Sequence, residues 1–260
     1  MKGPIVIKIG GSTFKHGDTT LEDLVTLQRV GIPMVVVHGG GDAINGWLNR
    51  LDIKSPFHGG YRVTDENTLV VVVAVLAGLV NKLLVASVNG AGGKAFGFCG
   101  ADGSLVEAKI KDEDLGLVGD VEKVNTGVID MVLKGGFIPI IAPVGWRPPK
   151  AKSKETLLNL NGDTMAGALA AALKAEELIF LTDVDGVLDA KGKLIEELDA
   201  VSVEELIASG VIKGGMIPKI EACLVALKKR GTARIINGTV PHALVNEIEG
   251  KGRGTTIVKK

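Results

Sequence analysis

The sequence has few aromatic residues and few cysteines. Aromatic residues make up only 3% of a 260-residue chain that is 46% hydrophobic, so Val, Ile, Leu and Ala must fill the core. The two cysteines, Cys99 and Cys223, lie far apart and form no CxxC pair. This spacing excludes a disulfide-stapled secreted domain or a cysteine zinc site, and it predicts a reduced, metal-free, cytoplasmic protein.

The sequence also lacks an excess of either charge. Lys and Arg together number 30, as do Asp and Glu, which argues against a nucleic-acid-binding protein because such proteins are usually basic. The N-terminus has no long apolar segment followed by a small-residue cleavage site, so it is not a signal peptide. The longest apolar run, from Leu69 to Val80, stops at Asn81 and Lys82. A membrane span needs about 20 apolar residues, so we expect a buried element and no membrane partner.

Glycine is abundant instead. The chain has 36 glycines, about twice the usual ~7%, and many of them flank short apolar runs rich in Val and Ile. These runs are PIVIKIG (4–10), PMVVVHGGG (33–41), KAFGFCG (94–100), FIPIIAPVG (137–145), LIFLTDV (178–184) and ARIING (233–238). Runs of this length and composition are typical of strands buried on both faces.

Helical patterns separate several of these predicted strands. They cover residues 20–30, 164–174, 203–209 and 220–229. Alternating strands and helices predict an α/β fold with an open, mostly parallel sheet. The segment GWRPPKAKSKE (145–155) is predicted to be a surface loop or hairpin tip because of its proline pair and basic residues.

The run from Leu69 to Val80 is predicted to be a helix. Its length exceeds that of a typical strand, and Thr64 and Asp65 before it are good N-cap residues. A helix that is apolar nearly all round must be covered on two sides. We therefore expect a homodimer in which a second copy of the chain covers this helix.

Two of the predicted strands end in glycine turns, and the backbone N–H groups of such turns can bind an anion. In IVIKIGGS, Lys8 stands inside an apolar strand just before Gly10 and Gly11, although it could also be an edge-strand lysine that points to solvent. In VVVHGGGD, Gly40 and Gly41 precede a predicted helix, although they could serve only the turn. The GxGxxG dinucleotide pattern is incomplete and GxxxxGK[ST] is absent, so neither a Rossmann nor a P-loop fingerprint is present.

Three further segments have polar residues where a ligand could bind. NLNGDT begins the helix near residue 164; there the amide side chains of Asn159 and Asn161 could hydrogen-bond a polar ligand, and Asp163 or Thr164 could be only a cap. LTDVDGVLD follows an apolar strand, and ligands of open α/β sheets bind outside the carboxyl ends of strands. KGGMIPK (213–219) places Gly-Gly between two lysines at the start of another helix.

Taken together and in order, these segments resemble the amino acid kinase family, and within it the enzymes that phosphorylate the side-chain carboxylate of N-acetyl-L-glutamate with ATP in arginine biosynthesis. The resemblance runs from Ile5 to Ile257. Its motifs are IKIGGS, VVVHGGGD, GGYRVTD, GLVNK, DLGLVGDV, FIPIIAPVG, NLNGDT, LTDVDGVLD, GVIKGGMIPK and GRGTTI. It implies an α/β/α sandwich with two lobes on one continuous sheet. Residues 1–174 would bind the amino-acid substrate and dimerise, and residues 175–260 would bind the nucleotide.

The resemblance also implies a role for individual residues. The catalytic residues would be Lys8, Lys219 and Asp163, with Asp163 orienting both lysines. The residues that bind the substrate would be Gly40, Gly41, Arg62 and Asn159, and those that bind phosphate would be Gly10 and Gly11. The nucleotide would be bound by Thr182, Asp183, Gly186, Lys213, Gly215 and Met216. ATP would bring Mg²⁺ with it, and the protein would supply no metal site of its own.

Other interpretations fit the same residues. The nearest is a sister kinase that acts on an acylated or carrier-bound aminoadipate or glutamate in lysine biosynthesis. A non-catalytic nucleotide- or amino-acid-binding regulatory protein is the alternative from another class, and a Rossmann dehydrogenase is a third that the incomplete glycine fingerprint argues against. The resemblance further suggests a dimer without strong inhibition by arginine, because the sequence begins at its first strand.

Overall fold

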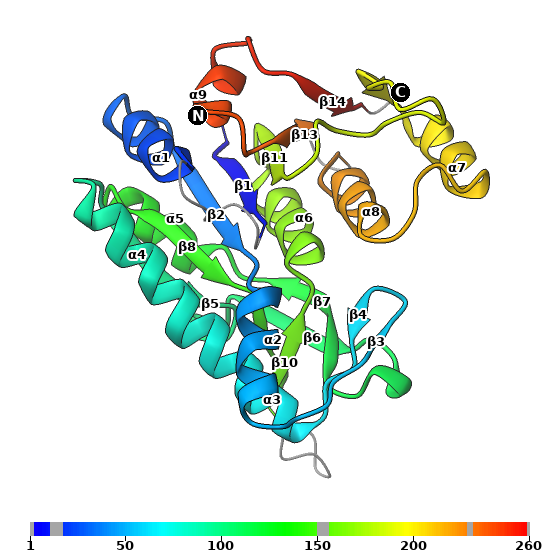
Figure 1. Cartoon of the computed structure of the whole chain (residues 1–260). Helices are drawn as coiled ribbons and strands as arrows, with labels where there is room; N and C mark the ends of the chain where they lie inside the picture. The colour runs from blue at the N-terminus through cyan, green and yellow to red at the C-terminus, as the bar shows by residue number, and fades with distance from the viewer. Residues whose placement is uncertain (1–2, 11–17, 150–155, 228–230, 259–260) are drawn as a thin grey trace.

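The protein is built on one eight-stranded sheet, seen here in a computed structural model that describes residues 3–10, 18–149, 156–227 and 231–258 (Figure 1). Across the sheet the strands are β12 (Glu197–Leu198), β14 (Gly254–Ile257), β13 (Thr232–Asn237), β11 (Glu177–Thr182), β1 (Ile5–Ile9), β2 (Met34–His38), β8 (Ile138–Ala142) and β5 (Ala95–Cys99). Neighbouring strands are parallel except β13 and β14, which pair antiparallel. All six predicted strand segments therefore lie in this sheet.

Helices cover both faces of the sheet. Alternation along β1 sends Ile5, Ile7 and Ile9 to one face and Val6 to the other. The first face packs against α1 (Thr20–Arg29), α4 (Asn81–Gly90) and α9 (Ala243–Ile248). The second packs against α5 (Gly127–Lys134), α6 (Gly162–Leu173) and α8 (Met216–Leu227). The predicted α/β/α sandwich with a mostly parallel sheet is confirmed.

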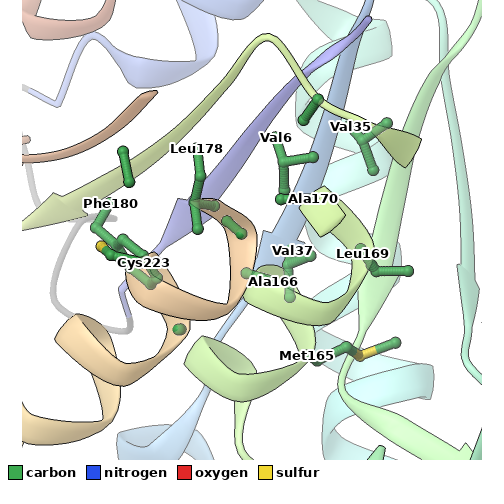
Figure 2. Packing of buried hydrophobic residues seen from close by; sticks show 14 of the residues in the cluster. Val6, Val35, Val37, Met165, Ala166, Leu169, Ala170, Leu178, Phe180 and Cys223 are labelled. Carbon is green, nitrogen blue, oxygen red and sulfur yellow. The ribbon is translucent and has the colours of Figure 1, made fainter. Parts of the chain in front are cut away.

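Close packing of α6 defines the core on the second face. Met165, Ala166, Leu169 and Ala170 of α6 lie against Val6, Val35 and Val37, and Phe180 lies near Cys223 of α8 (Figure 2). Each of these side chains is buried. The low aromatic content is thus matched by a core of small aliphatic side chains between helices that lie close to the sheet.

A second, smaller sheet was not predicted. Four strands close on themselves: β6 (Val106–Ile110), β7 (Val118–Val124), β9 (Val144–Trp146) and β10 (Leu157–Leu160). The apolar run 137–145 accordingly divides between β8 and β9. The segment 145–155 was predicted to be a surface loop or a hairpin tip. The antiparallel pairing of Gly145 and Trp146 with Leu158 and Leu157 agrees with a hairpin, but it shows that the predicted boundary was wrong, because residues 145 and 146 belong to β9; residues 150–155 lie outside the described part.

Several short elements connect these layers. A two-stranded hairpin of β3 (Phe57–His58) and β4 (Tyr61–Arg62) stands beside the small sheet. The remaining helical elements are α2 (Gly41–Arg50), η2 (Asp102–Ser104), η3 (Glu113–Leu115) and α7 (Ala200–Ala208). The predicted start of α8 at residue 220 was wrong, because the helix begins at Met216. Pro218 does not prevent this earlier start: it lies in the first turn, where a backbone N–H has no partner within the helix and its absence costs no hydrogen bond.

The predicted apolar helix is confirmed and is longer than expected. It runs over Glu66–Gly90 as α3 (Glu66–Val73), a π-helical segment η1 (Ala74–Val80) and α4. Asp65 caps it, as predicted, by accepting a hydrogen bond from the Thr68 N–H. By length and composition it could cross a membrane, yet core helices pass the same test, and 39% of its most apolar window is buried in the protein. Apolar side chains remain exposed on its outer face, including Val70 and Leu83.

The contact between α6 and α8 leads to a stability prediction. A Cβ added at Gly167 would lie 2.6 Å from the Ala222 carbonyl oxygen and 2.8 Å from its Cα. Gly167→Ala should therefore push the two helices apart and lower the free energy of unfolding by about 1–3 kcal/mol. The matched control is Gly46→Ala in α2, where an added Cβ meets nothing within 4 Å; it should stabilise the fold by about 0.5–1 kcal/mol. Urea unfolding of both variants tests this, and equal changes would contradict it.

Candidate active site

Two lysines from distant parts of the chain meet at one buried carboxylate. Lys8 Nζ lies 2.6 Å from Asp163 Oδ1, and Lys219 Nζ lies 3.0 Å from Asp163 Oδ2. Lys219 also donates a hydrogen bond to the Gly215 carbonyl oxygen at 3.1 Å. The three residues predicted to be catalytic, from β1, α6 and α8, thus form one cluster with a net charge of one positive unit.

Local sequence rules explain how these side chains reach the cluster. Lys8 follows Val6 by two residues, so it leaves β1 on the face that α6 covers. Asp163 stands in the first turn of α6, but the cap of that helix is Asn161, whose side-chain oxygen accepts hydrogen bonds from the N–H groups of Asp163 and Thr164. The hypothesis that Asp163 or Thr164 is the cap was therefore wrong, and the Asp163 carboxylate is left for the lysines.

The charge state of Asp163 follows from two opposed effects. Burial by itself would raise the pKa of this carboxyl group, but the nearby charges of Lys8 and Lys219 outweigh burial and hold its pKa below the ordinary value. Asp163 is therefore ionised at neutral pH. It can hold two ammonium groups in fixed positions without neutralising both.

The turn after β2 presents unused backbone donors. Gly39 donates its N–H to the Ile9 carbonyl oxygen, and α2 begins at Gly41. Within the described part of the chain, the N–H groups of Gly40 and Gly41 have no acceptor, as expected at the start of a helix. A Cβ at Gly40 would lie 2.6 Å from Leu76 Cδ2, so a larger residue here would displace the Leu76 side chain of the long helix.

The predicted substrate-binding residues surround one cavity of about 180 Å³. Gly40, Gly41, Arg62 and Asn159 all line it, together with Gly162, whose added Cβ would lie 3.5 Å from Lys8 Cε. The cavity is smaller than a typical ligand pocket of about 300–1,000 Å³, which favours a ligand of amino-acid size. A larger cavity of about 400 Å³ lies beside Gly40 and α4, but Arg62 does not line it, and the two lysines line neither cavity.

Arg62 is held firmly at the cavity wall. Its Nη2 donates a hydrogen bond to Asn45 Oδ1, and its Cζ lies 4.6 Å from the centre of the Phe57 ring. Its backbone carbonyl accepts from Thr64 Oγ1, which in turn accepts from Asn159 Nδ2. Burial lowers the pKa of Arg62, but a guanidinium remains charged at neutral pH. A planar cation in this position suits a carboxylate.

The residues predicted to bind nucleotide lie near Lys219, or at the end of β11 and after it. Gly215 contacts Lys219, and Met216 begins α8. Asp183 and Lys213 are exposed. None of the six predicted nucleotide residues lines the 180 Å³ cavity.

Structural contacts account for several of these positions. Thr182 Oγ1 donates to carbonyl oxygens of Val184 or Ile236, and a Cβ at Gly186 would lie 2.6 Å from Thr255 Oγ1. Gly10 donates its N–H to the Leu181 carbonyl oxygen at 3.3 Å, and Gly11 lies outside the described residues.

Sequence reasoning missed the part that several residues play in this site. Asn161 caps α6, Asn45 and Phe57 hold Arg62, and Tyr61 lines the cavity. Asn161 had a signal, since it stands directly before the helix that begins at Gly162. Asn45 and Phe57 had none, because their contact with Arg62 depends on how the hairpin lies against α2.

Comparisons with known proteins agree with this architecture. The model of the amino acid kinase family matches residues 3–237. The chain is 42% identical over 255 residues to an acetylglutamate kinase of Dehalococcoides mccartyi, covering 98% of this chain and 94% of that protein. It is 47% identical over 263 residues to an acetylglutamate kinase of Prochlorococcus marinus, covering 98% and 84%.

A solved structure shows the same fold. The Streptococcus mutans protein smu.665 superposes with a TM-score of 0.84 at 33% identity, and the match covers 99% of each chain. With a family match over most of the chain and relatives this similar over nearly its full length, the chain belongs to the amino acid kinase family.

Proposed function

We propose that this enzyme uses ATP to phosphorylate the side-chain carboxylate of N-acetyl-L-glutamate, a step of arginine biosynthesis. The observation that supports this most directly is the Lys8–Asp163–Lys219 cluster beside a small cavity lined by Arg62. The relatives at 42–47% identity are acetylglutamate kinases. An acceptor of amino-acid size fits a cavity of about 180 Å³.

The geometry suits transfer of a phosphoryl group between two anions. An oxygen of the acceptor carboxylate attacks the γ-phosphorus of ATP, the bond to the β–γ bridging oxygen breaks, and ADP leaves with that bond's electron pair. An ammonium group has three N–H donors. Lys219 directs two of these, toward Asp163 and Gly215, and Lys8 forms an ion pair with Asp163 at 2.6 Å. The third donor of Lys219 and the donors of Lys8 that do not face Asp163 can stabilise the equatorial oxygens of the transferring group.

The acceptor would be held by one cation and several neutral hydrogen-bond donors. The Arg62 guanidinium would bind the α-carboxylate, Asn159 would bind a neighbouring polar group, and the N–H groups of Gly40 and Gly41 would face the reacting carboxylate. Gly10 and Gly11 would contact phosphate. Mg²⁺ carried by ATP would neutralise phosphate charge; this fits a site whose carboxylate, Asp163, is already paired with two lysines.

The two substrates would bind to different parts of the chain. We place the acceptor in residues 1–174 and the nucleotide in residues 175–260, near the six residues around Lys219 and β11 named above. The boundary lies between α6 and β11, and the sheet runs across it. The outer face of the Glu66–Gly90 helix, with Val70 69% and Leu83 59% exposed, would be covered by a second copy of the chain.

A coupled assay of ADP release tests the proposed reaction. N-acetyl-L-glutamate should support turnover far better than glutamate or aminoadipate derivatives, which are the substrates of the alternative kinases. Lys8→Ala should lower kcat by about 10²-fold or more, since loss of one preorganised donor costs about that much. Wild-type turnover by Lys8→Ala would rule out this mechanism, and ATP binding without turnover on any carboxylate would support a regulatory protein instead.

The lowered pKa of Asp163 predicts how stability depends on pH. Because its pKa in the folded protein lies below the ordinary 3.8, its ion pairs stabilise the fold above that pH, and this contribution is lost as pH falls through the folded pKa. Asp163→Asn should cost about 3–5 kcal/mol at pH 7 by leaving two buried ammonium groups unpaired. Urea unfolding at pH 7 and pH 3 should show that the difference from wild type shrinks at the lower pH. If the difference in unfolding free energy between wild type and Asp163→Asn is the same at both pH values, Asp163 is not the ionised partner of the two lysines.

The proposed dimer predicts the effect of charge on the outer helix face. Val70→Lys combined with Leu83→Lys should convert the dimer to a monomer in sedimentation velocity, because two desolvated ammonium groups cannot be accommodated in an apolar interface. Val201→Lys is the control: Val201 is 67% exposed on α7, which packs against α8. The same mass for wild type and double variant would contradict this interface.

A further inference from the structure

A buried polar network lies directly behind the glycine turn. His38 at the end of β2 is fully buried, and so is Asn81 at the start of α4. His38 Nδ1 lies 2.8 Å from the Gly39 carbonyl oxygen, and His38 Nε2 lies 3.2 Å from Asn81 Nδ2. The segments that supply these side chains, VVVHGGGD and GLVNK, both belong to the family motifs, yet the proposed mechanism assigns neither residue a role.

The surrounding groups assign the donors and acceptors in this network. Asn81 Nδ2 lies 2.9 Å from the Ile140 carbonyl oxygen, which can only accept, and Asn81 Oδ1 lies 3.0 Å from the Lys82 ammonium, which can only donate. The second amide N–H has two acceptors within reach, His38 Nε2 at 3.2 Å and the Phe98 carbonyl oxygen at 3.5 Å. The shorter distance assigns this N–H to His38, so Nε2 of His38 accepts. Since the Gly39 carbonyl also only accepts, Nδ1 must donate. His38 is thus a neutral imidazole protonated on Nδ1.

The surroundings favour this neutral form. Burial lowers the pKa of His38 to about 4; the hydrogen bond to Gly39 opposes this effect, and the charges of Lys8 and Lys82 add to it. Gly97 makes room for the network, since a Cβ there would lie 2.2 Å from Asn81 Oδ1. The packing thus accommodates the Asn81 amide in one place only.

The consequence for the cavity comes from the planarity of the peptide bond. The Gly39 carbonyl and the Gly40 N–H belong to one peptide group, and no described peptide bond is cis, so the two point in opposite directions. A carbonyl held by His38 fixes where the Gly40 N–H points. Three successive glycines have many backbone conformations available, and the turn lines the cavity, so its donors can be preorganised only by contacts from outside the turn.

We propose that His38 and Asn81 are positioning residues: they hold the Gly39 carbonyl and so aim the Gly40 N–H at the acceptor carboxylate. The role rests on the proposed function, since that function supplies the carboxylate. The hydrogen-bond arrangement itself does not depend on the substrate. It can therefore be tested separately.

The first test reads the tautomer. In a long-range ¹H–¹⁵N spectrum at pH 7, the signal that disappears in His38→Asn is that of His38. In wild type it should show a proton on Nδ1 and an unprotonated Nε2. In Asn81→Leu, which removes the donor to Nε2, a share of the Nε2-protonated form should appear. A wild-type His38 protonated on Nε2 would overturn the proposal, whether or not the enzyme is active.

The second test is kinetic. His38→Leu and Asn81→Leu should lower kcat/KM for N-acetyl-L-glutamate by about 10–100-fold, the size expected for a misplaced catalytic donor, and should change the KM for ATP by less than about threefold. His38→Asn keeps a donor at the position of Nδ1, so it should recover part of the loss. Val88→Ala, a buried substitution elsewhere on α4, controls for lost stability.

The outcomes separate the two proposals. An inactive wild type that shows the Nδ1 tautomer would refute the proposed function and leave the network intact. An active wild type whose folded His38→Leu and Asn81→Leu variants keep kcat/KM within twofold would refute the positioning role. If the leucine variants do not fold, the positioning role is tested by kcat/KM of His38→Asn and by the tautomer of His38 in wild type.

Discussion

The site depends on one electrostatic arrangement, a buried carboxylate between two ammonium groups. Asp163 is held by Lys8 and Lys219 at 2.6 and 3.0 Å. Neither lysine could be buried beside the other without this counter-charge, and Asp163 could not stay ionised without the lysines. The arrangement joins the first strand, α6 and α8, so the catalytic geometry and the contact between distant segments are formed together. The cluster keeps one net positive charge. In the proposed reaction this charge would lie where the two anionic reactants meet.

The sheet order explains why these segments can meet. β1 lies between β11 and β2, and all three are parallel, so their carboxyl ends share one edge of the sheet. Gly10, Thr182 and the glycine turn after His38 all follow at that edge, where ligands of open α/β sheets bind. α6 packs across the same strands and brings its N-terminus there. Close approach of α6 to α8 at Gly167 sets how far Lys219 must reach.

The two sides of the cavity are made rigid in different ways. Arg62 is fixed by its neighbours Asn45 and Phe57 and by the chain of hydrogen bonds through Thr64 to Asn159. The glycine turn has no side chains of its own. Its backbone is held by neighbouring side chains instead: His38 contacts the Gly39 carbonyl oxygen, and Leu76 packs beside Gly40. Preorganised donors are the main means by which such a site can favour a transition state, since phosphoryl transfer needs no covalent nucleophile.

The sequence by itself determined the α/β class, six of the eight strands of the main sheet and the long apolar helix, because these features depend on local period and composition. The sequence also identified Lys8, Asp163 and Lys219 as candidate catalytic residues, since each stands in a motif and the order of these motifs resembles that of the family. The closure of the small sheet was decided only by tertiary structure: β6–β7 and β9–β10 are local antiparallel pairs, but β7 pairs with β10 and β6 with β9 across long stretches of chain. The same holds for Asn45 beside Arg62 and for Asn81 beside His38. Their sequence neighbours give no sign of such contacts, because a hydrogen bond between segments depends on how helices and strands pack, and packing is not a local property.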